Sequence, residues 1–382
     1  MDCDFIVIGG GIAGLSAAAR LAAHGRVVVV EAEDALGYHS SGRSVSFSHY
    51  GIGNSVVRGL TVASRPFFFG EQPEGFCATP LSRLVPSIYV AREETVAKLE
   101  ALLAEMLRFT EGPRMISPAE IQALCPVVRT GAGAAVTGIL DPTGLKLDAD
   151  ALLQSFARVT RVQGGQVLNG RRISRIEQVS GGWQVSTDAG ETLSAPVLVN
   201  AAGAWADKVA EMAGLRTIGL SPKRRTIIVV DPPAGMDVSA WPFVHAAASD
   251  FYMLPEAGQL LVSPVDEVDD EPGDAQPEDY DVALAAYQLE QYTTLTVSRI
   301  AHRWAGLRSF VADRTPTAGF DSEAPGFFWL IGQGGYGLQT APAMSRIVEA
   351  LVTGGAWPEG LAELGVTRER VAPNRLFRAQ GD

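Results

Sequence analysis

The opening thirty-one residues constrain the fold of this chain most, because a strand, a glycine-rich turn, a helix and a second strand follow one another directly. Gly9, Gly11 and Gly14 match the G-x-G-x-x-G pattern, in which the glycines allow a sharp turn, the approach of a pyrophosphate and close helix–strand packing. The helix expected over residues 12–24 points its positive N-terminal end at the phosphates. The valine run at residues 27–30 forms the second strand. We therefore predict a dinucleotide pocket.

Glu31, at the end of the second strand, limits which dinucleotide fits. Its carboxylate lies where a ribose hydroxyl pair requires an acceptor, and it would repel the 2′-phosphate of NADP. NAD and FAD remain open, because both present an adenosine diphosphate to the same turn.

The composition argues against several classes of function. The 382 residues predict two or three domains, and a formal net charge of −12, with no basic cluster longer than residues 223–225, predicts no nucleic-acid partner. Three cysteines lie far apart without metal-ligand spacing, which predicts reduced thiols, no metal site and a cytoplasmic location. No apolar run reaches the roughly 18 residues of a membrane span. Peripheral contact with the inner membrane stays open if a quinone accepts the electrons.

Further helices and strands follow the opening unit. Helices are expected at residues 93–108, 148–162 and 282–292, and after residue 337 to about residue 351. Strands are expected at residues 164–168, 171–179, 183–187, 196–203, 226–230, 251–254, 260–263, 304–310 and 326–331. We interpret the acidic stretch at residues 266–281 as a solvated loop.

A second strand-to-helix turn, Gly332 to Gly337, bears on the cofactor. It indicates that the chain returns to the nucleotide sheet near its C-terminal end. FAD, with its pyrophosphate at one turn and its isoalloxazine ring reaching toward another, fits such an arrangement better than NAD does.

Five motifs together make the chain resemble the D-amino-acid oxidase (DAO) family of FAD-dependent oxidoreductases. They are the opening fingerprint and residues 42–44 (Gly-Arg-Ser), 200–205 (Asn-Ala-Ala-Gly-Ala-Trp), 304–308 (Trp-Ala-Gly-Leu-Arg) and 332–337 (Gly-Gln-Gly-Gly-Tyr-Gly). The resemblance extends from Phe5 to about Leu351. Within the family, the chain is most similar to the bacterial D-arginine dehydrogenases.

The resemblance implies an α/β fold of mixed α+β character, in which a Rossmann-like FAD-binding domain is joined to a largely antiparallel-sheet substrate domain. The FAD-binding domain is discontinuous and is expected to comprise residues 1–47, 145–220 and 312–365. The substrate-binding domain is expected to comprise residues 48–144 and 221–311.

The resemblance also implies which residues hold FAD. The expected contacts are Gly9, Gly11, Ile12, Ala13, Gly14, Glu31, Ser41, Gly42, Arg43, Ser44, Val167, Ala202, Gly203, Trp205, Gly332, Gly334, Gly335, Tyr336, Gly337, Leu338 and Gln339. Some relatives attach flavin through a cysteine in the C-terminal half, whereas all three cysteines here precede residue 126. We therefore expect a non-covalent FAD.

The reaction that the family implies is removal of a hydride from Cα of an amino acid to flavin N5. The resulting imino acid hydrolyses to a 2-oxo acid and ammonia. The candidate substrate-site residues are Arg225, Tyr252, Arg308, His49, Tyr50 and Gly335. An arginine can grip a carboxylate with two hydrogen bonds and so fix the Cα hydrogen over the flavin.

Each of these candidates also has a structural interpretation. Arg308 could form a structural ion pair, and Arg225 could lie on a solvated strand edge. Tyr252 could be a core aromatic residue, and His49 and Tyr50 could belong to a plain surface loop rather than one that closes over substrate.

Two departures from the D-arginine dehydrogenases affect the expected substrate. Phe47 stands where those relatives place a histidine, and Ser87 stands where they place an acid. Because a buried guanidinium without a partner is costly, we predict a D-amino acid with an apolar or aromatic side chain rather than a basic one.

Other functions remain open at this stage. A secondary amine, such as sarcosine, or a 2-hydroxy acid could undergo the same hydride chemistry. An NAD-dependent dehydrogenase would share the opening turn, and a non-catalytic protein similar to the Rab GDP-dissociation inhibitors would share the fold. The electron acceptor, oxygen or a quinone, and the assembly, monomer or homodimer, are left undecided.

Overall fold

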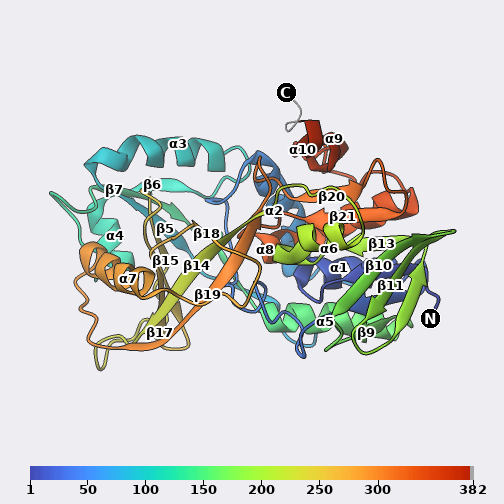
Figure 1. Cartoon of the computed structure of the whole chain (residues 1–382). Helices are drawn as coiled ribbons and strands as arrows, with labels where there is room; N and C mark the ends of the chain where they lie inside the picture. Colours follow the sequence, from blue (N-terminus) through green and yellow to red (C-terminus); the bar gives the residue numbers. More distant parts are fainter. Residues whose placement is uncertain (379–382) are drawn as a thin grey trace.

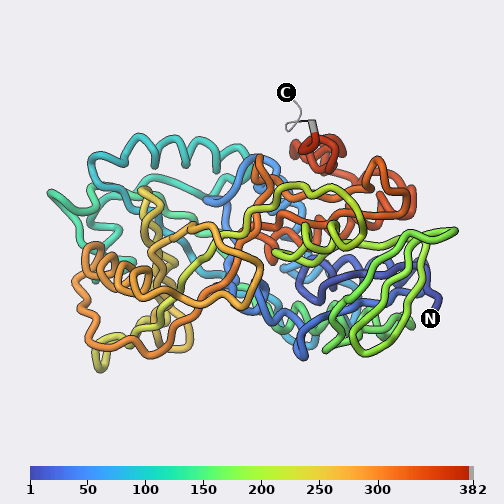
Figure 2. The backbone as a smooth tube through the Cα atoms, in the orientation of Figure 1, coloured from blue at the N-terminus to red at the C-terminus, as the bar shows by residue number. Residues whose placement is uncertain are grey.

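Two lobes, each built around its own sheet, make up the computed structural model, which describes residues 1–378 (Figure 1). The backbone passes between the lobes repeatedly (Figure 2). Its blue N-terminal, green and red C-terminal segments share one lobe, whereas its cyan and yellow segments and part of its orange segment form the other. The predicted mixed α/β fold class is therefore confirmed. Among the described residues, no helix is both long enough and apolar enough to cross a membrane.

A six-stranded sheet forms the centre of the first lobe. Its order is β20 (Thr317–Phe320), β21 (Phe327–Ile331), β13 (Val197–Asn200), β1 (Phe5–Ile8), β2 (Val27–Val30) and β9 (Gln166–Leu168). Neighbouring strands are parallel except that β20 runs antiparallel to β21. Strands of such a sheet are apolar throughout because both faces are covered.

Alternate residues of these strands enter two different cores. Val7 and Val29 pack with α1 (Ile12–Leu21), α5 (Ala149–Val162) and α8 (Gly337–Thr353) on one face. Ile6 and Val28 pack on the other face with Trp183 of a three-stranded antiparallel sheet. That sheet consists of β10 (Ile173–Val179), β11 (Gly182–Thr187) and β12 (Thr192–Ala195), and η2 (Gly203–Trp205) with α6 (Ala206–Met212) follows β13. Helix α1 ends earlier than predicted, since residues 22–25 form a turn.

A nine-stranded, mostly antiparallel sheet forms the second lobe. Its order is β18 (Val268–Asp269), β14 (Ser221–Val230), β17 (Gln259–Ser263), β16 (Tyr252–Glu256), β15 (Phe243–Ala246), β5 (Ser87–Ala91), β7 (Thr137–Asp141) and β6 (Arg114–Ile116), with β19 (Ile300–Phe310) also paired to β14. Helices α4 (Pro118–Leu124) and α7 (Asp279–Tyr292) contribute to the core on one face, where Ile121 and Leu289 pack against strand residues such as Val262. The opposite face, which we call the free face, carries no part of that core, and its residues Ile227 and Tyr252 line a cavity.

The remaining elements join the two lobes or cover their edges. Strands β3 (Phe47–Ser48), β8 (Leu145–Leu147) and β4 (Ser82–Leu84) make a small sheet, and the other helices are α2 (Ser55–Phe68), η1 (Glu93–Thr95), α3 (Val96–Met106), α9 (Arg368–Val371) and α10 (Asn374–Arg378). The two large sheets follow the segments expected for the two domains, since every strand of the six-stranded sheet lies within residues 1–47, 145–220 or 312–365. We keep this division as our proposal for the domains.

The acidic stretch at residues 266–281 differs from the solvated loop that we expected. Asp281 is only 3% exposed, and its carboxylate accepts hydrogen bonds from the Arg224 side chain at 3.1 and 3.3 Å. Asp270 and Glu278 also form ion pairs with Arg224, at 3.2 and 2.9 Å. The expectation is wrong for Asp281 and for Asp266, whose side chain is only 4% exposed, whereas Asp269, Glu278 and Asp279 are exposed as expected. Because a strand alternates its side chains between faces, Arg224 points to the α7 side of the sheet, where it pairs with the buried Asp281.

We expect the substitution Arg224→Ala to lower the free energy of unfolding by about 3–5 kcal/mol, because it leaves the buried Asp281 carboxylate without its partner. Urea unfolding followed by circular dichroism measures the change. Arg175→Ala is the matched control, since the Arg175 side chain is 69% exposed. Equal stability of the two variants would contradict this prediction.

Candidate active site

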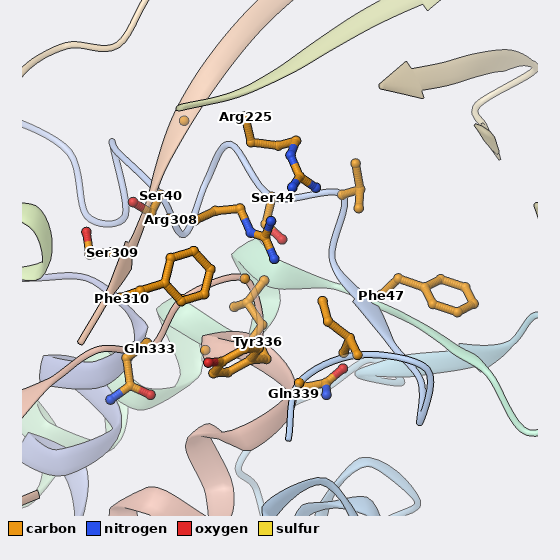
Figure 3. A pocket seen from close by; sticks show the side chains of 18 of the residues that line it. Ser40, Ser44, Phe47, Arg225, Arg308, Ser309, Phe310, Gln333, Tyr336 and Gln339 are labelled. Carbon is orange, nitrogen blue, oxygen red and sulfur yellow. The ribbon is translucent and has the colours of Figure 1, made fainter. Parts of the chain in front are cut away.

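A cavity of about 670 Å³ lies where the two sheets meet. Three groups of residues line it: the N-terminal end of α1 with the loop after β2, the glycine-rich turn before α8, and the free face of the nine-stranded sheet. Figure 3 shows side chains from the sheet and from the glycine-rich turn converging on this space.

The opening glycine turn has the shape that a pyrophosphate requires. Gly9 has a φ of +110°, and a Cβ there would lie 2.5 Å from the Ala201 carbonyl oxygen. A Cβ at Gly14 would overlap the Gly9 carbonyl oxygen, so α1 can pack this close to β1 only with glycine at that position. No side chain caps α1 at Gly11, and Gly11 lines the cavity. The positive end of the helix therefore faces the space where phosphates would bind.

Glu31 is held in place by the backbone of the same turn. Its Oε2 accepts a hydrogen bond from the Gly10 N–H at 2.5 Å, and its Oε1 accepts one from the Glu33 N–H at 2.8 Å. The carboxylate is thus fixed at the tip of β2, beside the turn, which is the position predicted for a ribose acceptor.

The C-terminal glycine turn forms the opposite wall. Gly332 and Gly334 have φ values of +72° and +51°, and α8 begins after Tyr336 without a side-chain cap. Gln339 in the first turn of α8 is buried, and its amide bonds to the backbone of His49, at 3.2 Å to the nitrogen and 3.5 Å to the oxygen. A second helix N-terminus therefore points toward the cavity, and Gln339 fixes the segment that carries His49.

Arg43 is anchored by groups other than a ligand. Its guanidinium donates hydrogen bonds to the carbonyls of Ala275 at 3.0 Å and Ala305 at 3.1 Å, and it pairs with Asp274. Gly306 allows this approach, because a Cβ there would lie 3.3 Å from the Arg43 Cβ. The Arg43 charge is therefore compensated within the protein, while its side chain still borders the cavity.

The expected cofactor contacts divide into two sets. Those that line the cavity are Gly11, Ile12, Ala13, Ser41, Arg43, Ser44, Gly203, Gly332, Gly334, Gly335, Tyr336, Gly337, Leu338 and Gln339. Those that do not line it are Gly9, Gly14, Glu31, Gly42, Val167, Ala202 and Trp205. Several of the second set shape the turn itself, and Val167 lies on β9 beside β2.

Arg225 and Arg308 come together on the free face of the nine-stranded sheet. Arg225 of β14 pairs with Gly306 of β19, and Lys223 pairs with Arg308, so all four residues share one face. Figure 3 shows the two guanidinium groups pointing toward each other over the glycine-rich turn. A Cβ at Gly335 would overlap the Arg308 guanidinium, which explains the glycine at that position.

Glu267 connects the two arginines. Its carboxylate lies 2.9 Å from Arg308, 3.5 Å from Arg225 and 2.8 Å from Arg314. Burial and the neighbouring Arg225 charge lower the pKa of Arg308 to about 9. An anion beside these guanidinium groups would favour their charged form.

The inner wall of the cavity is aromatic and uncharged. His245 lies directly opposite Tyr252 on one side and Tyr89 on the other, and the His49 ring stacks on it at 4.9 Å. The Tyr89 hydroxyl lies 2.7 Å from His49 Nδ1. Burial lowers the pKa of His49 to about 3 and lowers that of His245 well below its ordinary value, so both imidazoles are neutral at pH 7.

His49 and Tyr50 do not belong to the plain surface loop that was the alternative interpretation, because they are only 5% and 3% exposed. The two side chains lie in different surroundings. His49 lines the cavity, whereas Tyr50 does not and packs with Leu99 and Met106 in a separate core. Ser87 lies on the same face of β5 as Tyr89 but does not line the cavity.

Sequence reasoning missed many residues of the cavity wall, among them Glu267, Tyr89, Phe243 and His245. The alternation of Phe243 and His245 with apolar neighbours was a usable strand signal. For Glu267 no local signal exists, because its role depends on arginines that reach it from β14 and β19.

Two glycine-rich turns at helix N-termini and two arginines on the adjoining sheet face line one cavity, an arrangement that fits a two-lobed flavin-dependent oxidoreductase. The profile of the FAD dependent oxidoreductase family, DAO, matches residues 4–351, and the chain belongs to this family. Its cofactor is FAD, so the NAD alternative is excluded.

Individual relatives are distant. FAD-dependent oxidoreductase domain-containing protein 1 of Bos taurus is 25% identical over 92% of this chain and 81% of its own length. L-2-hydroxyglutarate dehydrogenase of Indibacter alkaliphilus is 28% identical over 56% of this chain and 53% of its own length. Among solved structures, L-proline dehydrogenase of P. horikoshii has a TM-score of 0.81 at 20% identity and covers 99% of this chain and 98% of its own.

We expect Glu31→Gln to weaken FAD binding by about tenfold, since a charge-assisted hydrogen bond to the ribose contributes roughly 1.5–3 kcal/mol and the amide retains part of it. Titration of the flavin-free protein with FAD, followed by flavin fluorescence, gives the affinity. Glu363→Gln, at an exposed position, serves as the control. If the affinity for FAD is unchanged in the Glu31 variant, Glu31 does not bind the ribose.

FAD is expected to leave the protein when it is denatured. Cys3 and Cys125 are buried, Cys77 is partly buried, and none of the three lines the cavity. After acid precipitation the yellow colour should remain in the supernatant. Flavin that stays with the precipitated polypeptide would show a covalent link and contradict the prediction.

Proposed function

We propose that this protein oxidises a D-amino acid that has an apolar or aromatic side chain, giving an imino acid that water hydrolyses to a 2-oxo acid and ammonia. The observation that carries the proposal is the pair of guanidinium groups, Arg225 and Arg308, on one face of the sheet at the cavity. In this proposal they hold the substrate carboxylate, and Arg308 does so with two parallel hydrogen bonds. Bound FAD supplies the hydride acceptor.

The protein contributes orientation more than acid–base chemistry. The carboxylate anchor, together with Tyr252 on β16, limits how the substrate Cα can lie over the glycine-rich turn. His49 has too low a pKa to take a proton efficiently at pH 7, so we assign it hydrogen bonding as a neutral group. Tyr50 has no direct role in this proposal, because it does not line the cavity.

The lining of the cavity supports an uncharged substrate side chain. Phe47, Ile227, Phe243 and Val265 form an apolar wall beside the anchor. The carboxylates among the described lining residues are Glu267 and Asp313, and both are already engaged by arginines. A basic side chain would therefore enter an apolar wall without a free partner, which is unfavourable.

The test is anaerobic reduction of the flavin by a panel of D-amino acids, L-amino acids, N-methyl amino acids and 2-hydroxy acids. We expect D-leucine or D-phenylalanine to bleach the visible absorption faster than D-arginine, with ammonia as a product. A higher kcat/KM for D-arginine, or bleaching confined to another class, would overturn the proposal. Readmission of air then shows whether oxygen reoxidises the flavin or a quinone-like acceptor is needed.

Oxidation of a secondary amine or a 2-hydroxy acid is the second candidate. The similarity to an L-proline dehydrogenase and to an L-2-hydroxyglutarate dehydrogenase favours it. Both substrate classes carry a carboxylate next to the reacting carbon, so the same arginine anchor would serve them. The panel separates the candidates, because a 2-hydroxy acid releases no ammonia and an N-methyl amino acid releases methylamine.

A further inference from the structure

The carboxylate anchor already contains a carboxylate of its own, Glu267. This side chain bonds to Arg308, Arg225 and Arg314 and borders the cavity. A substrate carboxylate that uses the two inner arginines must therefore share them with Glu267. The Glu267 carboxylate therefore contributes to the net charge of the site that binds the substrate carboxylate.

The loop that carries Glu267 is held in a strained conformation. Val265 has a φ of +58°, a region that β-branched residues avoid. Asp266 stabilises the loop by accepting hydrogen bonds from the Thr226 N–H at 2.8 Å and the Thr226 hydroxyl at 3.0 Å, and its carbonyl accepts one from Arg225 at 2.8 Å. Backbone strain persists only where surrounding contacts specify it, so the position of Glu267 is built into the fold.

The charges of this cluster do not balance. Three guanidinium groups, those of Arg225, Arg308 and Arg314, face the two carboxylates of Asp266 and Glu267. Other charged groups at the cavity are compensated among the described residues, since Asp313 pairs with Arg375 and Arg43 pairs with Asp274. One positive charge is left over.

We propose that Glu267 is a built-in counter-ion that sets the substrate charge, leaving the anchor one positive charge and hence a preference for monocarboxylates over dicarboxylates. The proposal rests on the proposed function, in which Arg225 and Arg308 hold the substrate carboxylate. Without Glu267 the cluster would carry a second uncompensated charge and accept a second carboxylate. The wild-type cluster disfavours a dicarboxylic 2-hydroxy acid for the same reason.

Two acids of equal chain length, pentanoate and glutarate, test this proposal. Each is titrated into the FAD-loaded protein, and the perturbation of the flavin absorption gives its Kd. We expect wild-type protein to bind pentanoate more tightly than glutarate, and Glu267→Gln to shift the ratio of the two Kd values toward glutarate by about tenfold or more. Asp269→Asn, a charge-neutralising change at an exposed position on β18, should leave the ratio unchanged.

A second variant tests the same charge balance without relying on the folding of Glu267→Gln. Arg314→Gln removes the surplus charge and should weaken the binding of both acids, by about tenfold for pentanoate. The double variant Glu267→Gln/Arg314→Gln restores one surplus charge and should restore the wild-type ratio. A ratio that Glu267→Gln leaves within threefold of wild type, or unchanged pentanoate affinity in Arg314→Gln, would overturn the proposal.

The two proposals fail in distinguishable ways. Binding of these acids requires no turnover, so a protein whose flavin no amino acid reduces can still show the shift in ratio, and then only the proposed function fails. If monocarboxylic amino acids reduce the flavin but Glu267→Gln leaves the ratio of the two Kd values unshifted, only the proposed role of Glu267 is refuted. If pentanoate fails to perturb the wild-type flavin, the carboxylate anchor itself is refuted.

Discussion

Replacing Arg308 by alanine is expected to lower kcat/KM for the best substrate by roughly 30- to several-thousand-fold, equivalent to about 2–5 kcal/mol of transition-state stabilisation. The Arg308 side chain is only 14% exposed and faces the cavity, so water cannot replace it as the partner of a buried carboxylate. Arg308→Lys should lose much of the same effect, because an ammonium group keeps the charge but not the planar fork. Steady-state kinetics with the most active member of the substrate panel gives the values.

The matched control for Arg308 lies on the same strand. Arg303 of β19 is 50% exposed and pairs with Asp279 away from the cavity, so Arg303→Ala should keep wild-type kcat/KM. Flavin content and the melting temperature establish that both variants are folded. If Arg308→Ala stays within threefold of wild type, the carboxylate is held elsewhere and the proposed function loses its main support.

The nucleotide half of the molecule was predictable because its signals are local. The backbone conformation at Gly9 and the close packing at Gly14 require glycine within a few residues of one another, and the apolar strands on either side are continuous in sequence. Strands β1, β2 and β21 are buried along their whole length, so each appears in the sequence as an unbroken apolar run. Local patterns of this kind need no knowledge of distant pairing.

The substrate half depends on pairing between distant segments, which sequence patterns do not reveal. His245 reaches the cavity wall because β15 pairs in parallel with β5. Glu267 does so because β14 and β19 bring Arg225 and Arg308 near its loop, and the turn after β19 adds Arg314. An acidic run is hydrophilic whether it faces solvent or a buried arginine. Only the tertiary fold separates the two cases.

The adjacent residues His49 and Tyr50 show the same limit at shorter range. They were predicted as a pair, yet their side chains lie in different surroundings, because the chain leaves the strand at Ser48 and turns at Tyr50. His49 therefore faces the cavity while Tyr50 enters the core that contains Leu99. The sequence placed the segment correctly near the site but did not show which of its side chains faced the cavity.

Replacing Gly14 by alanine is expected to reduce the FAD content of the purified protein to below about a tenth of the wild-type value. The added Cβ would overlap the Gly9 carbonyl oxygen and lie 3.2 Å from a Val7 side-chain carbon. Helix α1 would have to move away from β1, which costs about 1–3 kcal/mol in packing and displaces the backbone amides from the phosphates. The ratio of flavin to protein absorbance measures the loss.

The control for Gly14 is another glycine whose Cβ meets no obstacle. A Cβ at Gly355, just beyond α8, would lie no closer than 3.4 Å to any neighbouring atom, so Gly355→Ala should retain FAD. Far-UV circular dichroism and titration with added FAD separate loss of the cofactor site from loss of the fold. A Gly14→Ala protein that binds FAD with wild-type affinity would mean that the first turn of α1 does not hold the pyrophosphate. The contact would then have to come from the second helix N-terminus, at α8, whose glycine turn faces the same cavity.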